Sequence, residues 1–287
     1  MNNVHICGFS YMLPHSTGFS TAGAVVTDDD ISRYLDDRKT ASNEQISREF
    51  FCTAEKLYTA GLPSHRTGVS FGTSDGCFSS LSTAAEGIAV KGVKGMKPKD
   101  ASNCTMSGAA AKTAIALGIK GFSLTNCDGM NGGLDAVIFA CDMLRSGSAD
   151  YALAGGGDEG KAYGAVMLST DDKSEGCTVS PVSCGLVFGS DTAAQIKHLV
   201  SCAVDNCGTN IEGAVIVSED HYAEIRTALS EQISAPDISE FSVPDNTTSA
   251  SGIMAIEYTV SLASEKGSIL LVQCGKEGYF SAVMIKK

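Results

Sequence analysis

A glycine-rich segment between a predicted strand and a predicted helix is the first feature whose residue types could do chemistry. It runs from Cys127 to Gly133 with the sequence CDGMNGG. A group held at the start of a helix lies at the positive end of the helix dipole, beside free backbone N–H groups. These features activate a thiol and can hold an oxyanion. Cys127 is the thiol here, but its place at the end of a predicted buried strand favours an inert core thiol over a reactive nucleophile.

Asp128 and Asn131 flank the same turn, and two roles are open to them. They could bind a ligand, or their side chains could cap the following helix, and we expect capping. The glycines of the segment need no ligand, because they allow a sharp strand-to-helix turn and close packing of the helix.

Other chemistry-bearing residues give weaker signals. Residues 155–160, GGGDEG, lack the GK[ST] ending of a phosphate-binding loop, so we expect no nucleotide. His221 begins a predicted helix, where a capping or surface role is expected ahead of a catalytic one. The eleven cysteines include no CxxC pair, so we expect reduced thiols, no metal and no cofactor.

The apolar pattern predicts an α/β protein. The predicted strands are 4–8, 67–72, 122–126, 151–154, 186–189, 196–204, 213–217, 269–272 and 282–285, and the predicted helices are 42–60, 79–91, 109–117, 134–146, 221–233 and 252–263. Across residues 158–180 the apolar periodicity weakens and charged residues become more frequent, which indicates a surface loop or the seam between two halves. We therefore predict two α/β halves, residues 1–175 and 176–287, in one compact body.

The composition narrows the classes of function. The chain has 287 residues, of which 43% are hydrophobic and 19% charged, and its net charge is −12. Nucleic acid is not an expected partner, because binding to phosphates needs a basic surface. The apolar runs are too short to span a bilayer, and we expect a cytoplasmic protein.

The segment from Lys120 to Glu159 resembles the β-ketoacyl synthases of the thiolase superfamily. Members show a GPSxT strand, a TACxS elbow, a buried helix, an RxGxxD motif and an AGG triplet before an acidic residue. The residues that fall in register here are Ser123, Thr125, Arg145, Gly147, Asp150, Ala154, Gly155 and Gly156. Weaker likenesses lie at residues 68–73, 247–252, 271–275 and 282–283. The resemblance implies a thiolase-type fold, with two related halves in α-β-α-β-α layers and a shortened second half.

The same register implies that the catalytic residues are degenerate. Met130 stands where the family has its nucleophilic cysteine, and a thioether cannot form an acyl-enzyme. Asn246 stands where the family has the histidine of its GHT motif, and an amide cannot match the proton chemistry of imidazole. The HGTGT motif has no counterpart beyond a faint likeness around His221. Residues 275–278 replace the aromatic–glycine gating loop, and the family lysine falls near Phe241.

A synthase fold without its nucleophile resembles the chain-length factors of type II polyketide and aryl polyene systems. That likeness implies a heterodimer with an active ketosynthase, in which this subunit shapes the acyl tunnel and the acyl carrier protein binds mainly to the partner. Chain-length factors of aromatic polyketide systems generally carry glutamine at the elbow, so Met130 departs from them. The candidates for the tunnel or interface are Thr105, Met106, Ser107, Phe122, Thr125 and Met130.

Two alternatives stay open. One is a malonyl-thioester decarboxylase or acyltransferase of the same fold that uses Asn246 and His221. The other is a noncatalytic homodimeric scaffold.

Overall fold

The computed structural model describes residues 3–14, 19–36, 43–171, 176–208, 210–234 and 237–287. Its strands are β1 (His5–Met12), β2 (Ala24–Val25), β3 (Thr67–Gly72), β4 (Ser123–Asn126), β5 (Tyr151–Gly157), β6 (Tyr163–Ser169), β7 (Thr178–Leu186), β8 (Gly213–Val217), β9 (Ile238–Glu240), β10 (Ser268–Cys274) and β11 (Tyr279–Lys286). Its helices are α1 (Asp28–Asp36), α2 (Gln45–Glu55), α3 (Phe78–Lys91), α4 (Pro98–Ala101), α5 (Gly108–Leu117), α6 (Gly132–Arg145), α7 (Thr192–Asn206), α8 (Tyr222–Gln232) and α9 (Ser251–Lys266).

The strand order repeats between the two halves. The described strands follow the path β4-β3-β5-β6-β1-β7-β11-β10-β8-β9, and β2 adds to β1. With β2 left aside, the five strands of each half can be numbered 1 to 5 along the chain. From the outer edge of the sheet inward, both halves then have the same strand order, 3-2-4-5-1. The last strand of each half, β6 or β11, is antiparallel to both of its neighbours. The predicted pair of related α/β halves is thus confirmed.

The predicted boundary between the halves falls at residues 172–175, which lie outside the described residues. The division into residues 1–175 and 176–287 stays a prediction.

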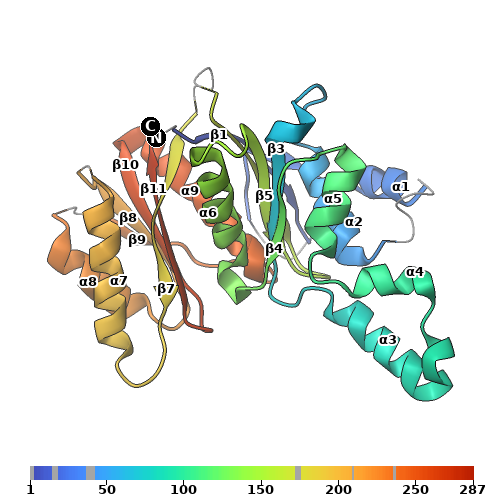
Figure 1. Cartoon of the computed structure of the whole chain (residues 1–287). Coiled ribbons are helices and arrows are strands. Elements are labelled where there is room, and N and C mark those ends of the chain that lie inside the picture. The colour runs from blue at the N-terminus through green and yellow to red at the C-terminus, as the bar shows by residue number, and fades with distance from the viewer. Residues whose placement is uncertain (1–2, 15–18, 37–42, 172–175, 209, 235–236) are drawn as a thin grey trace.

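Five layers result from the way the helices cover the strands (Figure 1). α6 and α9 lie in the middle and contact each other and strands of both halves. α2 and α5 pack on the outer side of the first half, and α7 and α8 on the outer side of the second. α6 and α9 each bury eight residues, as expected for helices with a sheet on both sides.

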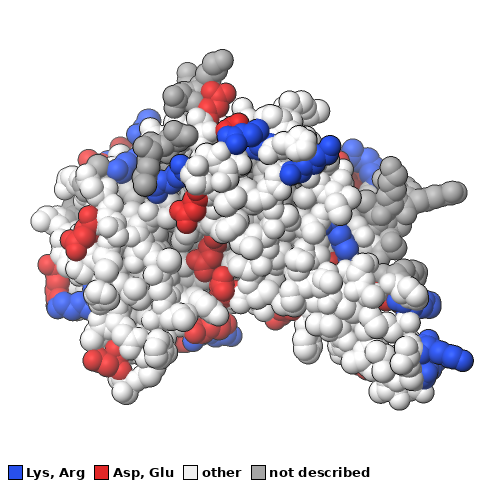
Figure 2. Space-filling model, viewed as in Figure 1, with Lys and Arg blue, Asp and Glu red and all other residues white. Residues whose placement is uncertain are grey.

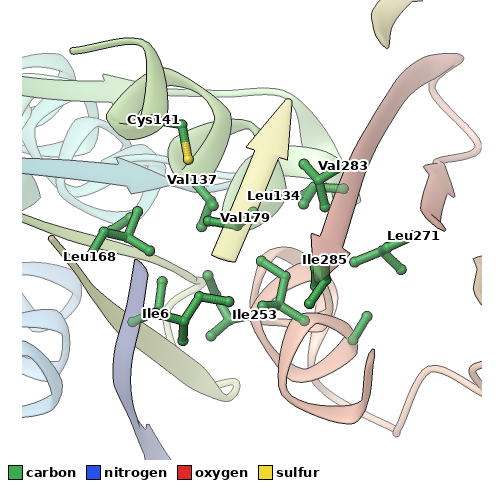
Figure 3. Packing of buried hydrophobic residues seen from close by; sticks show 14 of the residues in the cluster. Ile6, Leu134, Val137, Cys141, Leu168, Val179, Ile253, Leu271, Val283 and Ile285 are labelled. Carbon is green, nitrogen blue, oxygen red and sulfur yellow. The ribbon is translucent and has the colours of Figure 1, made fainter. Parts of the chain in front are cut away.

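The main core joins the two halves around α6 and α9. Figure 3 shows Leu134 and Val137 of α6 among side chains from both halves, including Leu168, Ile253 and Val283. All five are at most 1% exposed. Their burial fixes the start of α6, and so the elbow before it, against the second half.

Several predicted elements were wrong. Residues 196–204 are not a strand but part of α7, because Ile196, Val200 and Ala203 recur at helical spacing and are fully buried. Of residues 186–189, predicted as a strand, only Leu186 is in one, as the last residue of β7. Residues 158–180 contain the wholly buried β6, so this stretch is not simply a surface loop. No described helix is long and apolar enough to cross a membrane.

Candidate functional site

The elbow connects β4 to α6 through a 3₁₀ turn, Gly129–Asn131. Gly129 has a φ of 59°, which glycine adopts without strain. The turn is packed so closely on β3 that a Cβ at Gly72 would lie 1.9 Å from the carbonyl carbon of Gly132. Met130 follows Gly129 and is only 7% exposed. The sharp turn expected from the glycines is therefore present, with a thioether at its centre.

Polar side chains tie the elbow to the last hairpin of the chain. Gln273 donates from Nε2 to the carbonyl oxygen of Met130 at 3.0 Å. Asn131 donates from Nδ2 to the carbonyl oxygen of Gln273 at 3.2 Å and to Ser281 Oγ at 2.9 Å. The predicted capping role of Asn131 was wrong, because its amide bonds across to β10 and β11 instead of to the start of α6. Asp128 makes no capping bond either, and it accepts from Asn126 Nδ2 at 2.7 Å.

A pocket of about 300 Å³ brings together the two positions at which the resemblance implies lost catalytic residues. Both Met130 and Asn246 line it, as do Lys161 and Thr248. Asn246 has a φ of 59° and its carbonyl oxygen accepts from the N–H of Ala162 at 2.8 Å. Thr248 has a φ of 27°, a strained value for a β-branched residue that the surrounding structure must hold in place.

The pocket carries more negative than positive side chains. Four acids line it, namely Asp75, Glu219, Asp245 and Glu277, against the two bases Lys161 and Lys276. The carboxylate of Glu277 lies directly against the elbow, because a Cβ at Gly129 would be 2.6 Å from Glu277 Cδ. An acid therefore occupies the space beside the turn where an anionic intermediate would need hydrogen-bond donors.

Asp158 joins the two halves beside the pocket, through hydrogen bonds that include the pocket-lining residues Ser74 and Thr248. Its Oδ1 accepts from Thr73 Oγ1 at 2.7 Å and from the N–H of Ser74 at 2.6 Å. Its Oδ2 accepts from Thr248 Oγ1 and, at 3.2 Å, from the N–H of Ser249. Burial alone would raise the pKa of this carboxyl group, but these hydrogen bonds outweigh burial and hold its pKa below the usual value. Asp158 thus fixes the backbone around Thr248 from the first half.

Asp135 is a partly buried acid in the first turn of α6. Burial raises its pKa to about 7, although Ser281 donates a hydrogen bond to its Oδ1. The native protein therefore retains a proton on Asp135 at pH values where the unfolded chain, with a pKa near 3.8, has released it. The free energy of unfolding must fall as the pH rises through this window.

The substitution Asp135→Asn tests this assignment. Asparagine cannot ionise, so the variant is expected to be more stable than wild type by about 1–3 kcal/mol at pH 8 and nearly equal to it at pH 4. Urea unfolding at both pH values measures the difference. Asp142→Asn, an exposed position on the same helix, is the control. Parallel pH profiles for wild type and Asp135→Asn would contradict the assignment.

The other predicted site residues lie apart from the pocket. Thr105, Met106 and Ser107 are exposed before α5, and Thr125 lies on β4. Phe122 precedes β4 and meets Phe139 edge-on at 5.5 Å between ring centroids. His221 does not line the pocket; it stands at the N-cap position of α8, and its carbonyl oxygen accepts from Ile225.

One further prediction from the sequence was wrong, and the roles of two residues were not predicted. Cys127 is exposed rather than buried in the core. Partial burial of its sulfur atom and the charge of Asp128 nevertheless raise its thiol pKa, which opposes thiolate formation. The roles of Asp158 and Glu277 were missed, because both depend on contacts between segments far apart in the chain. Residues 155–157 belong to buried β5, and no phosphate-binding loop forms there.

The model of the β-ketoacyl synthase N-terminal domain matches residues 17–175. A search of curated proteins found no match.

Solved structures share the fold over essentially the whole chain. The ishigamide ketosynthase/chain length factor superposes with a TM-score of 0.77 and 17% identity, covering 99% of each chain. A type II polyketide synthase ketosynthase, solved with its acyl-carrier protein, gives 0.78 and 16%, covering 100% of this chain and 99% of that one. A β-ketoacyl synthase from Burkholderia phymatum gives 0.74 and 12%, with 100% of both chains covered.

These likenesses confirm the thiolase-type fold that the motifs indicated. The family model covers more than half of the chain and includes the elbow, Met130 and Asp158. The protein belongs to the β-ketoacyl synthase family.

Proposed function

We propose that this chain is a noncatalytic, chain-length-factor-like subunit that pairs with an active ketosynthase in type II polyketide or aryl polyene synthesis. The observation that carries the proposal is Met130, a buried thioether on an otherwise intact elbow. Asn246 lies in the same pocket, so both degenerate positions meet at one site. A thioether cannot attack a thioester, and an amide cannot exchange protons as imidazole does.

An unpaired sheet edge supports the need for a partner. Among the described residues, β4 pairs with β3 alone, which leaves its other edge open. Side chains on the flanking segments are exposed and apolar, with Ile115 79% and Met106 46% exposed. An open edge beside apolar residues is a surface that folded proteins normally cover. A ketosynthase subunit that adds a strand to β4 would cover it.

The proposed role in chain length follows from this placement. Phe122 and Thr125 lie on or beside β4, and Met106 lies just before α5. An acyl chain that extends from the partner's active site toward this edge would meet these side chains first. Apolar Met130 suits a hydrocarbon or polyene chain better than a polar residue would.

The decarboxylase alternative has less support. A malonyl thioester carries a carboxylate, and the pocket that would receive it is lined by four acids and two lysines. Glu277 lies against the elbow and would repel that carboxylate. His221 does not line the pocket. Carbon dioxide released from malonyl carrier protein above the uncatalysed rate would favour this alternative.

Co-expression with an active ketosynthase tests the proposed function. We expect a stable one-to-one heterodimer by size exclusion, and carrier-bound products of a defined length by mass spectrometry. The ketosynthase expressed alone is the control, and its products are expected to be absent or heterogeneous in length. A purely homodimeric chain that leaves product length unchanged would support the scaffold alternative instead.

A further inference from the structure

An arm of residues 78–104 stands out from the body beside β4. It consists of α3, the 3₁₀ turn Gly92–Gly95, α4 and the 3₁₀ turn Ser102–Cys104. Figure 1 shows it projecting at the lower right of the molecule. α3 is 14 residues long and buries none of them, whereas α6, of the same length, buries eight.

The apolar side of α3 faces solvent. Phe78, Leu81, Ala85 and Ile88 follow at intervals of three, four and three residues, so they share one face of the helix. Phe78 is 68% exposed, and Leu81 and Ile88 are each 41% exposed. This is the a/d spacing of helices that pack against another helix.

The inner side of α3 is occupied by the arm itself and by a polar hollow. The backbones of Gly87 and Gly95 touch, and Cys104 Sγ lies 3.6 Å from the carbonyl oxygen of Ser80. A hollow of about 320 Å³ separates the arm from the body, lined by hydroxyl groups of α3 and by acids that include Glu44 and Glu159. The helix is therefore inverted relative to a core-facing one, with its polar side inward and its apolar side outward.

The outer end of the arm is basic, although the chain as a whole has a net charge of −12. Lys91, Lys94 and Lys97 are exposed there, and none of them forms an ion pair with a described residue. Figure 2 shows the arm as a mostly uncharged lobe with blue side chains at its outer end. A partner that meets this end must be acidic at that point.

We infer that the arm clasps the active ketosynthase subunit, by laying the Phe78–Leu81–Ala85–Ile88 face against a helix of that subunit and its lysines against an acidic patch. The inference rests on the proposed function and adds a second contact to the β4 edge. The two surfaces are continuous: Cys77, just before α3, lies 3.5 Å from Met106, between the sulfur atoms of the two side chains. One subunit added at β4 would therefore cover the arm as well.

Two other occupants fit the surface less well. A second copy of this chain would bring two charges of −12 together, which opposes association. A lipid surface could accept the lysines and exposed valines of the arm, but it offers no hydrogen-bond partners to the adjoining open edge of β4.

The test replaces the apolar stripe and measures heterodimer affinity by mass photometry. Leu81→Glu/Ile88→Glu is expected to raise the dissociation constant about tenfold or more, because it places two charges in an apolar contact. Ser79→Gln/Thr83→Gln adds polar side chains to the same helix away from the stripe, without adding charge to the acidic hollow, and is expected to stay within about twofold of wild type. Lys91→Glu/Lys94→Glu is expected to slow association most at low salt. Thermal unfolding checks that each variant folds.

The outcomes distinguish failure of the arm contact from failure of the proposed function. A wild-type heterodimer whose affinity survives Leu81→Glu/Ile88→Glu overturns the clasp and leaves the proposed function standing. A wild-type chain that forms no heterodimer overturns both. Loss of a homodimer, or of binding to phosphatidylglycerol vesicles, with heterodimer affinity unchanged would assign the arm to that other occupant and overturn the clasp.

Discussion

Replacement of Asp158 by alanine is expected to lower the free energy of unfolding by about 3–5 kcal/mol. The carboxylate is fully buried and accepts from two threonine hydroxyl groups and from backbone N–H groups on both halves. Its removal leaves those donors in the interior without an acceptor, and each costs free energy there.

Urea unfolding at pH 7 measures the loss, and Glu159→Ala, at the next and less buried position, is the control. Because the pKa of Asp158 is held below its usual value, its contribution is present above the unfolded pKa near 3.8 and disappears as the pH falls through the lower, folded pKa. The difference between wild type and Asp158→Ala should therefore shrink in acid. A loss under about 1 kcal/mol at pH 7 would contradict the role assigned to this residue.

The same substitution should also disturb the pocket. Thr248 keeps its strained φ of 27° while its hydroxyl group donates to Asp158. Without that acceptor Thr248 loses its hydrogen bond to the first half, and the bond from the N–H of Ala162 to the carbonyl oxygen of Asn246 remains. One buried acid thus links the stability of the fold to the geometry of the pocket that Met130 and Asn246 line.

Local sequence predicted the elbow and much of the fold well. The strand–glycine–helix order around Met130 depends on residues close together in the chain, so motif and periodicity were sufficient. α5, α6, α8, α9 and most strands lie within a few residues of their predicted bounds. α7 was missed because its isolated apolar residues were taken for a strand, although their spacing is helical.

What the sequence could not predict depends on contacts between distant segments. Asn131 resembles a helix cap in sequence, yet its amide reaches the last hairpin, 142 residues further along the chain. The stripe on α3 has the spacing of a core-facing helix, and nothing local indicates that it faces outward. Cys127 follows a predicted buried strand, but that strand lies at the sheet edge, where the cysteine is exposed.

The central claim is that this chain takes no acyl group while its partner does. Met130 has no ionisable proton, and burial together with Asp128 opposes ionisation of the nearby Cys127 thiol. In a heterodimer with an active ketosynthase and acyl-loaded carrier protein, the acyl group is therefore expected on the partner alone.

The most direct measurement is intact mass spectrometry of both subunits after that incubation, with Cys127→Ala as a matched control for stray thiol acylation. We predict an acyl adduct on nearly every ketosynthase subunit and none on this chain. A stoichiometric acyl adduct on this chain, formed in the wild type and still present in Cys127→Ala, would contradict the account.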